Sequence, residues 1–330
     1  MLRRSLPYLL LVGIGAASWG FWRQGSALKV EGNPRSLARH SPLSLPPRLA
    51  TPVVTRLSFL TDLSQPYQVR INLLRSTLAE GCSEPELCYL YKLLVKGADK
   101  AEIPEQGYVV ANDLMTQLFC HETDPKRFAD NFTALLHDPQ QPEVIRDYAV
   151  QFLATWLNPR SALATPSALA VPSPEIAAQV LNSLVTAATS PAFSQTSVPG
   201  TTLMMLVDLT RSGSGVDCSK AIATLKPWLT QALGEGSALN LAVRVSAVTA
   251  AGVLAPEEFR PTLRKIAYRT DGSAALQLPA LASLGQSGEA TDLPQLQKIA
   301  ATQPALAYAA ADACRVLTTR LTGDPAPISQ

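Results

Sequence analysis

The last third of the chain contains three similar segments, which span residues 225–254, 259–287 and 292–319. Proline, leucine and alanine recur in them at intervals of 33 or 34 residues. The matching positions are Pro227, Pro261 and Pro294, then Leu229, Leu263 and Leu296, and then Ala247, Ala280 and Ala313. Each segment has the pattern of a helix, a short polar turn and a second helix. Because one helix pair of this size cannot bury its own apolar face, neighbouring pairs must stack. The repeat therefore predicts an all-α fold, an α-solenoid of stacked antiparallel helix pairs.

Small residues within the repeat predict where helices approach one another. We expect Ala247, Ala280 and Ala313 to lie where adjacent second helices meet, because a larger side chain would force them apart. Gly252 is matched by Gly285 in the same register. The repeated proline lies in the first helix of each pair, where it removes one hydrogen bond and is expected to bend the helix.

Helical periodicity also covers the first half of the chain. Apolar residues recur at three- and four-residue intervals from about Pro52, and a second such pattern runs from Val69 through Leu73 to Leu78. Further helices are predicted over 84–96, 104–120, 126–137 and 142–157. Ser173, Pro174 and Glu175 have the composition of a helix start. Taken in order, the predicted regions are residues 1–23 as a membrane anchor or signal peptide, 24–50 as a Pro-rich linker, 51–157 as N-terminal helical repeats, 158–172 as a loop, 173–321 as C-terminal repeats and 322–330 as a disordered tail.

A Val-Arg pair with alanine three residues after the arginine marks the second helix of several pairs. The copies are Val243-Arg244 with Ala247, Ile145-Arg146 with Ala149, and a weaker Val69-Arg70 with Leu73 in place of alanine. Together with the proline in the first helix, this pattern resembles the HEAT-repeat family of ARM-like α-solenoids, including its short bacterial type. The resemblance is strongest over 217–320 and weaker over 126–157. In the last two repeats the arginine is replaced by Gln277 and Ala310.

The resemblance implies a helical solenoid that serves protein–protein interaction. In HEAT-like stacks the repeated arginine usually supports neighbouring turns by hydrogen bonding. The alternative is that Arg146 and Arg244 contact a partner protein. Both interpretations stay open at this point.

The N-terminus has the composition of a targeting segment. Arg3 and Arg4 precede an uncharged run from Leu6 to Trp22, which suits a short membrane span or a signal-peptide core. Aromatic residues at the end of this run favour an uncleaved anchor, whereas the small residues Ala16-Ala17-Ser18 offer a cleavage site. We expect a single pass through the inner (cytoplasmic) membrane at residues 6–22 with the body in the periplasm, or secretion to the periplasm after cleavage.

The charge balance argues against a nucleic-acid partner. Three of the 28 basic residues flank the first apolar run, which leaves 25 basic and 26 acidic residues over 24–330. No Lys/Arg block occurs after residue 56. Nucleic-acid binding requires a surface that neutralises phosphates, so we expect no nucleic-acid partner.

Five cysteines are present, and only Cys82 and Cys88 lie close enough in sequence for a local disulfide. Ser83 and Glu86 have the spacing of a capping box, so Cys82 would precede a helix and Cys88 would lie in its first turns. This disulfide is a possible pairing in an oxidising compartment, and the alternative is that the cysteines are small buried side chains.

No catalytic or cofactor motif is present in the sequence. It contains no G-x-S-x-G elbow, phosphate-binding loop, dinucleotide fingerprint or C-x-x-C-H motif. Cys120 and His121, together with Cys82 and Cys88, match no standard zinc spacing, and adjacent helical residues point about 100° apart. The sequence therefore predicts no enzyme activity, no cofactor, no metal and no small-molecule substrate.

The predicted function is a non-enzymatic scaffold or adaptor of the cell envelope that binds a protein partner along one face of the solenoid. Two alternatives remain. Some bacterial HEAT-like proteins attach bilin pigments to phycobiliproteins, which would require a cytoplasmic body. An extracytoplasmic carrier of hydrophobic ligands would require a large apolar groove.

Overall fold

The computed structural model of the chain describes residues 55–97, 104–158 and 167–323. The chain divides into two compact units, residues 1–42 and 43–330, and all described residues belong to the second unit. The predicted anchor (1–23), the linker (24–50) and nearly all of the predicted tail lie outside the described residues. Within the described ranges, no helix has both the length and the apolar character needed to cross a membrane.

The described ranges are entirely helical, with thirteen α-helices and no strand. The α-helices are α2 (Tyr67–Leu78), α3 (Glu84–Gly97), α4 (Pro104–His121), α5 (Pro125–His137), α6 (Glu143–Leu157), α7 (Pro174–Thr189), α8 (Val198–Arg211), α9 (Ser219–Leu233), α10 (Leu241–Leu254), α11 (Pro256–Ala267), α12 (Ala274–Ser287), α13 (Leu293–Thr302) and α14 (Ala307–Thr322). Three short 3-10 helices accompany them: η2 (Thr55–Thr61), η3 (Pro191–Phe193) and η4 (Ala290–Asp292).

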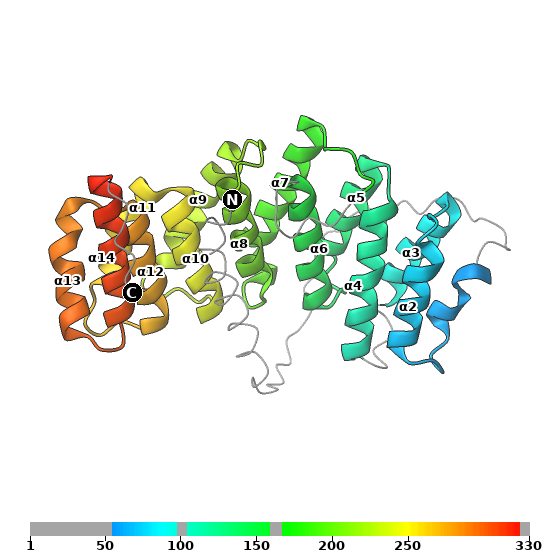
Figure 1. Cartoon of the computed structure of the whole chain (residues 1–330), viewed down its shortest axis with the longest axis horizontal. Helices are drawn as coiled ribbons and strands as arrows, with labels where there is room; N and C mark the ends of the chain where they lie inside the picture. Colours follow the sequence, from blue (N-terminus) through cyan, green and yellow to red (C-terminus); the bar gives the residue numbers. More distant parts are fainter. Residues whose placement is uncertain (1–54, 98–103, 159–166, 324–330) are drawn as a thin grey trace. The chain divides into compact units, whose positions relative to one another are not determined.

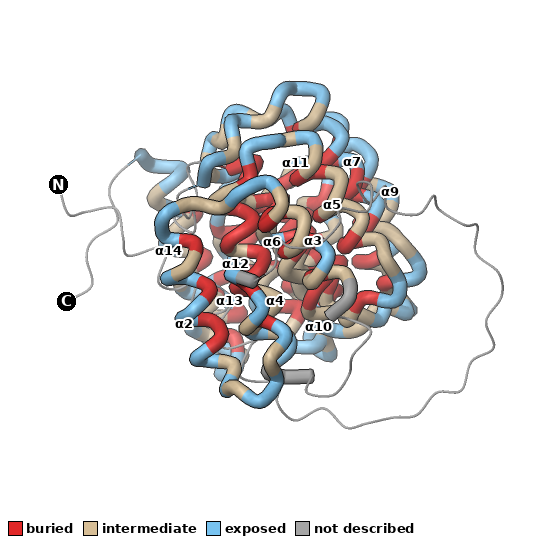
Figure 2. The backbone as a smooth tube through the Cα atoms, turned by 90° about the vertical axis from the view of Figure 1, so that its right-hand side faces the viewer, coloured by how far each residue is buried: buried red, intermediate tan, exposed pale blue. Residues whose placement is uncertain are grey.

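The helices form pairs that follow one another in series (Figure 1). The first pair is η2 with α2, the next is α3 with α4, and the last is α13 with α14. Each even-numbered helix also packs against the next even-numbered helix, from α2 to α14. The odd-numbered helices form the second row, and the buried residues lie between the helices (Figure 2). The predicted all-α series of helix pairs, consistent with an α-solenoid, is confirmed.

Most predicted helices of the first half agree with the structure to within one residue. The helices predicted over 84–96, 104–120, 126–137 and 142–157 are α3, α4, α5 and α6. The predicted start of α7 is also confirmed, because Ser173 is the N-cap and its Oγ accepts a hydrogen bond from the backbone N–H of Ile176.

Small residues let successive even-numbered helices approach closely, as the repeat predicts. Ala247, Ala280 and Ala313 are buried on α10, α12 and α14. A Cβ on Gly285 would lie 2.9 Å from the Cα of Ala313 on the next even-numbered helix, and a Cβ on Gly252 would collide with the Ser283 side chain. The backbones of these helices are therefore nearly in contact at each glycine.

The repeated proline does not have one role, which corrects the sequence prediction. Pro227 and Pro261 lie inside α9 and α11, but Pro294 lies in the first turn of α13. A backbone N–H in the first turn has no hydrogen-bond partner within the helix. Proline, which lacks this N–H, is therefore tolerated there and does not bend the helix. The repeat pattern also gives no indication of Pro279, which lies inside α12, the second helix of its pair.

The first helix pair differs from the prediction as well. The periodicity that begins near Pro52 predicts a helix, and the described part of it is the short 3-10 helix η2. In α2 the core positions are Ile71, Leu74 and Leu78. Val69 and Leu73, which the periodic pattern also includes, are exposed.

An aromatic cluster fills the core between α4, α5 and α6, with ring centroids 4.2–5.8 Å apart. Its members are Phe119, Phe128, Phe132, Phe152 and Trp156. The long connection from α6 to α7 is tied to this region. Trp156 Nε1 donates to the Ala170 carbonyl at 3.0 Å, and Ser167 Oγ donates to the Phe119 carbonyl at 2.5 Å.

Candidate interaction surface

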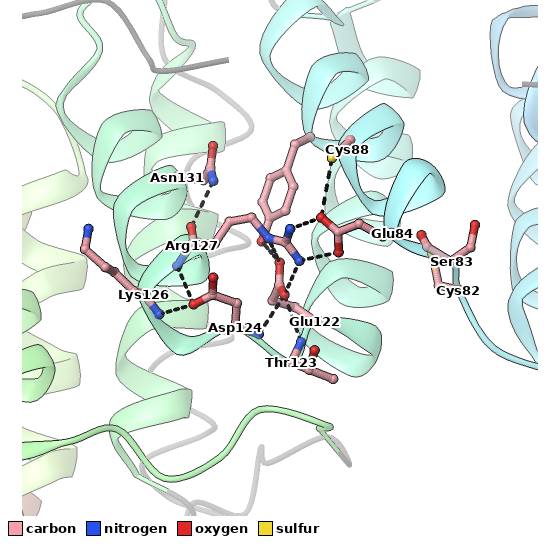
Figure 3. A network of polar contacts seen from close by, with 11 residues as sticks. Cys82, Ser83, Glu84, Cys88, Glu122, Thr123, Asp124, Lys126, Arg127 and Asn131 are labelled. Carbon is pink, nitrogen blue, oxygen red and sulfur yellow. Dashed lines mark hydrogen bonds and ion pairs between the residues drawn. The ribbon is translucent and has the colours of Figure 1, made fainter. Parts of the chain in front are cut away.

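The densest polar network joins α3, α4 and α5 around Glu122 (Figure 3). This carboxylate is 0% exposed. It accepts hydrogen bonds from Arg127 Nε and Nη2 at 2.7 Å each, from the backbone N–H groups of Thr123 and Asp124 at 2.8 Å each, and from Tyr91 Oη at 3.0 Å. Arg127 also pairs with Glu84 on α3. Every lone pair of Glu122 that faces the protein is thus engaged.

The electrostatics of this network favour the charged pair. Hydrogen bonding to Glu122 raises the pKa of Arg127, and burial raises the pKa of the Tyr91 hydroxyl. Asp124 is the N-cap of α5 and accepts from the backbone N–H groups of Lys126 and Arg127. Since the groups satisfy one another, the network is a structural joint between two helix pairs.

The position of the repeated arginine links the second helix of a pair to the end of the first. Arg70 Nη1 donates to the Leu60 carbonyl at 3.2 Å. Gln277, which replaces the arginine in α12, donates through Nε2 to the carbonyls of Arg269 at 2.6 Å and Ala267 at 3.3 Å. The side chains at these two positions thus bond to the first helix of their own pair or to the turn that follows it.

Arg146 and Arg244, the two predicted partner contacts, occupy the equivalent positions of α6 and α10. Arg146 is 8% exposed, and its guanidinium carbon lies 4.5 Å from the ring centroid of Phe193. Burial lowers its pKa. Arg244 is half-buried in the first turn of α10. In the described part of the chain, the Nε atoms of both arginines are buried without a hydrogen-bond partner.

Two carboxylates of α6 hold the residue that precedes α8. The backbone N–H of Ser197 donates to Glu143, and Ser197 Oγ donates to Asp147 Oδ2. Burial raises the pKa of Asp147 to about 6, although hydrogen bonds from Ser197 and Thr201 oppose the shift. These contacts join the third and fourth helix pairs.

Cys82 and Cys88, the possible disulfide pair, are free thiols in the structure. Cys82 lies before α3 with its Sγ 3.8 Å from the Ser83 carbonyl, and Cys88 lies one turn inside α3 with its Sγ 3.7 Å from Glu84 Oε1. The two thiols thus have separate partners. Burial raises the pKa of Cys82 to about 12. Glu86 accepts from the Ser83 backbone N–H, which is one half of the predicted capping box.

The described ranges contain no group of three or more His, Cys, Asp or Glu side chains arranged to hold a metal ion. Clefts are present in the same part of the chain. One, of about 540 Å³, lies between the α11–α12 and α13–α14 turns and includes Thr270, Gln277 and Gln303 in its lining. Another, of about 520 Å³, lies beside Cys82 and includes Arg56 and Glu86, whose side chains form an ion pair at 2.7 Å.

The outward sides of α8, α10 and α12 form a continuous surface that we call the neutral face. Its residues are spaced three and four apart on each helix, so they share one side. They are Thr201, Met204 and Asp208 of α8, Ala242, Val245 and Thr249 of α10, and Ala275, Leu278 and Ala282 of α12, all of them half-buried or exposed. The three helices pack against one another in this order. Asp208 is the one charged residue among these nine.

Helix α11 of the odd-numbered row has the opposite chemistry. Five charged residues lie on α11 alone: Glu257, Glu258, Arg260, Arg264 and Lys265. Several are ion-paired to neighbouring pairs, as in Lys226–Glu258 at 2.6 Å and Arg264–Asp292 at 2.6 Å. By contrast, α10 contains one charged residue and α12 contains none. Helix α11 therefore exposes a charged surface, whereas α10 and α12 expose an almost uncharged one.

The neutral face is not among the predictions made from the repeat, although the repeat contains a pattern that indicates it. The interval of 33 residues that aligns Ala247 with Ala280 also aligns Val245 with Leu278. Comparison of the chain with family models, with curated proteins and with solved structures finds no match.

Proposed function

We propose that this protein is a non-enzymatic interaction scaffold of the cell envelope, a solenoid of HEAT type that binds an uncharged segment of a partner protein on the neutral face. The observation that carries the proposal is the almost complete lack of charge on the outward sides of α8, α10 and α12. Charged residues are depleted from the cores of protein interfaces, because they lose hydration there. The Pro and Val-Arg pattern supports the HEAT type, and the apolar run at residues 6–22 supports a membrane location.

An aliphatic column crosses the neutral face from helix to helix. Met204 on α8 and Val245 on α10 are half-buried, and Leu278 on α12 is 41% exposed. Methionine adapts to partners of different shape, and methionine is enriched in interfaces. The small neighbours Ala242, Ala275 and Ala282 leave room for a partner backbone to approach.

The spacing of the helices indicates the form of the partner segment. Closely packed helices lie about 8–10 Å apart. An extended chain in the polyproline II conformation advances about 3.1 Å per residue with three residues per turn, so every third side chain points the same way and three residues span about one helix spacing. A segment that crosses the three helices therefore meets them with every third side chain. We propose an extended, uncharged partner segment with an apolar residue at every third position.

Selection from a displayed library of random 15-residue peptides on the full-length protein tests this proposal. We expect enriched peptides to lack charge and to repeat apolar residues at intervals of three. Enrichment of charged sequences, or of none, would contradict it.

Two substitutions of similar exposure localise the binding. Leu278→Asp places a charge in the aliphatic column, and we expect it to weaken binding of a selected peptide at least tenfold. Leu321→Asp adds the same charge at a 44% exposed position of α14, outside the neutral face, and should leave the affinity unchanged. Equal affinities of both variants for the peptide would rule out the neutral face as the site. Circular dichroism checks that both variants fold.

A further inference from the structure

The first helix pair leaves an aliphatic surface of α2 uncovered. Val69 is 42% exposed and Leu73 is 37% exposed. At the equivalent positions of the pairs that share the arginine pattern, Ile145 is 5% exposed and Val243 is 1% exposed. Ala149 and Ala247, which correspond to Leu73, are fully buried. The same place in the repeat is thus buried in later pairs and open in the first.

The preceding even-numbered helix is what covers this place in later pairs. A Cβ on Gly200 of α8 would lie 3.9 Å from the Cα of Val243 on α10. In the described part of the chain α2 is the first even-numbered helix, so no described helix of this row precedes it. Its other sides are occupied, since Arg75 pairs with Asp113 of α4 at 2.6 Å and Arg70 reaches the Leu60 carbonyl of η2. The side that remains is the one that a preceding helix of this row covers in later pairs.

We propose that residues 43–54 of the same chain cover Val69 and Leu73 and thereby close the N-terminal end of the stack. The segment, LSLPPRLATPVV, contains five large aliphatic side chains, and Arg48 is its one charged residue. Its three prolines disfavour a helix and favour an extended chain. The terminal unit of a stacked repeat must present a polar outer surface or be covered, and this segment supplies the cover.

The reach and the connectivity of the segment fit this role. Residues 43–54 run directly into η2, which packs against α2. Twelve extended residues span up to about 40 Å, whereas the twelve residues of α2 span about 18 Å. A tethered segment is present at an effective concentration of about millimolar. It therefore outcompetes a second copy of the chain or another soluble partner for the same surface.

Photo-crosslinking in the full-length protein tests the proposal. With p-benzoylphenylalanine in place of Leu73, we expect an intrachain adduct to a peptide from residues 43–54, identified by mass spectrometry. Leu278, which is 41% exposed on α12, is the control position and should give no such adduct. An adduct between two chains, an adduct to lipid, or no adduct to 43–54 at position 73 would overturn the proposal.

A pair of charge substitutions gives a second measurement. Leu45→Asp removes an aliphatic side chain of the segment, whereas Ser44→Asp adds the same charge beside it. We expect Leu45→Asp to speed hydrogen exchange of the α2 amides several-fold and Ser44→Asp to leave it almost unchanged. Equal exchange in both variants and the parent would count against the proposal. The neutral face lies on other helices, so peptide binding there should be the same in all of these proteins.

Discussion

Single small residues set how closely the even-numbered helices approach. A Cβ on Gly285 would meet the backbone of α14, and backbone atoms cannot move aside as a flexible side chain can. A Cβ on Gly252 would meet the side chain of Ser283 instead. The alanines at 247, 280 and 313 are buried in the same series of interfaces. These residues matter because of the space that their side chains leave free.

Gly285→Ala should therefore destabilise the protein by about 1–3 kcal/mol through overpacking. Gly107→Ala is a matched control, since it is also a helical glycine but a Cβ there meets nothing within 4 Å. It should stabilise the protein by about 0.5–1 kcal/mol, because alanine loses less backbone entropy in a helix. Urea unfolding of both variants measures the two values. Equal effects would show that the α12–α14 contact does not limit residue size.

A second prediction at this scale concerns pH. Asp147 has a pKa near 6 in the folded protein, because it is buried, against an ordinary value of 3.8. The folded state binds this proton more tightly than the unfolded state, so its contribution to stability rises as the pH falls through 6 and stops rising near 3.8. At pH 8 the buried charge is a cost, which Asp147→Asn removes.

We expect Asp147→Asn to be more stable than the parent at pH 8 by on the order of 1 kcal/mol. The difference should shrink as the pH falls below 6 and become smallest near pH 3.8. Burial lowers the pKa of His121, so protonation of this residue at low pH destabilises the folded protein. Because this effect is the same in both proteins, the difference between their free energies of unfolding reports on Asp147. A difference that is independent of pH between 5 and 8 would show that Asp147 titrates normally.

At the scale of the elements, buried polar joints fix one helix pair to the next. Glu122 ties the end of α4 to the start of α5, and through Tyr91 and Arg127 it ties both to α3. Glu143 and Asp147 tie the start of α6 to the start of α8. These joints lie at the turns, where helix ends expose unpaired backbone groups.

Glu122→Gln should cost about 3 kcal/mol, because it leaves the charge of Arg127 without its buried partner and puts an NH2 donor where a carboxylate oxygen accepted hydrogen bonds. Asp312→Asn breaks an exposed ion pair of 2.5 Å with Arg315 and should leave the free energy of unfolding almost unchanged. Chemical denaturation of both variants tests this. A small effect of Glu122→Gln would mean that water replaces the joint at little cost.

Helix positions were largely predictable from the sequence, whereas contacts between elements were not. Periodicity and caps are local, so they located α3 to α6 and the start of α7 correctly. The Glu122 network joins residues up to 43 positions apart through Arg127 and Glu84, and no local pattern reports such a contact. The exposure of Val69 was missed for the same reason. The pattern of α2 is that of a helix with neighbours on both sides, and burial depends on whether both neighbours are present.

At the scale of the whole described unit, the serial arrangement explains the difference between the two rows. The odd-numbered helices carry many of the ion pairs between successive pairs, and the even-numbered helices from α8 to α12 carry small and aliphatic residues. The repeat of 33 residues predicted the series because its period equals one helix pair. The repeat did not predict the neutral face, because outward residues make few contacts that restrict which residue type can stand there.

Each pair in such a series contacts mainly its neighbours, so damage to one interface should stay local. Gly285→Leu places a large side chain against Ala313 at the interface between the last two pairs. Hydrogen exchange followed by mass spectrometry in the full-length variant tests the serial arrangement most directly. We predict faster exchange in α12, α13 and α14, with α4, α5 and α6 protected as in the parent. A uniform loss of protection from α4 to α14 would contradict it, because it would show one cooperative core in place of a chain of neighbouring pairs.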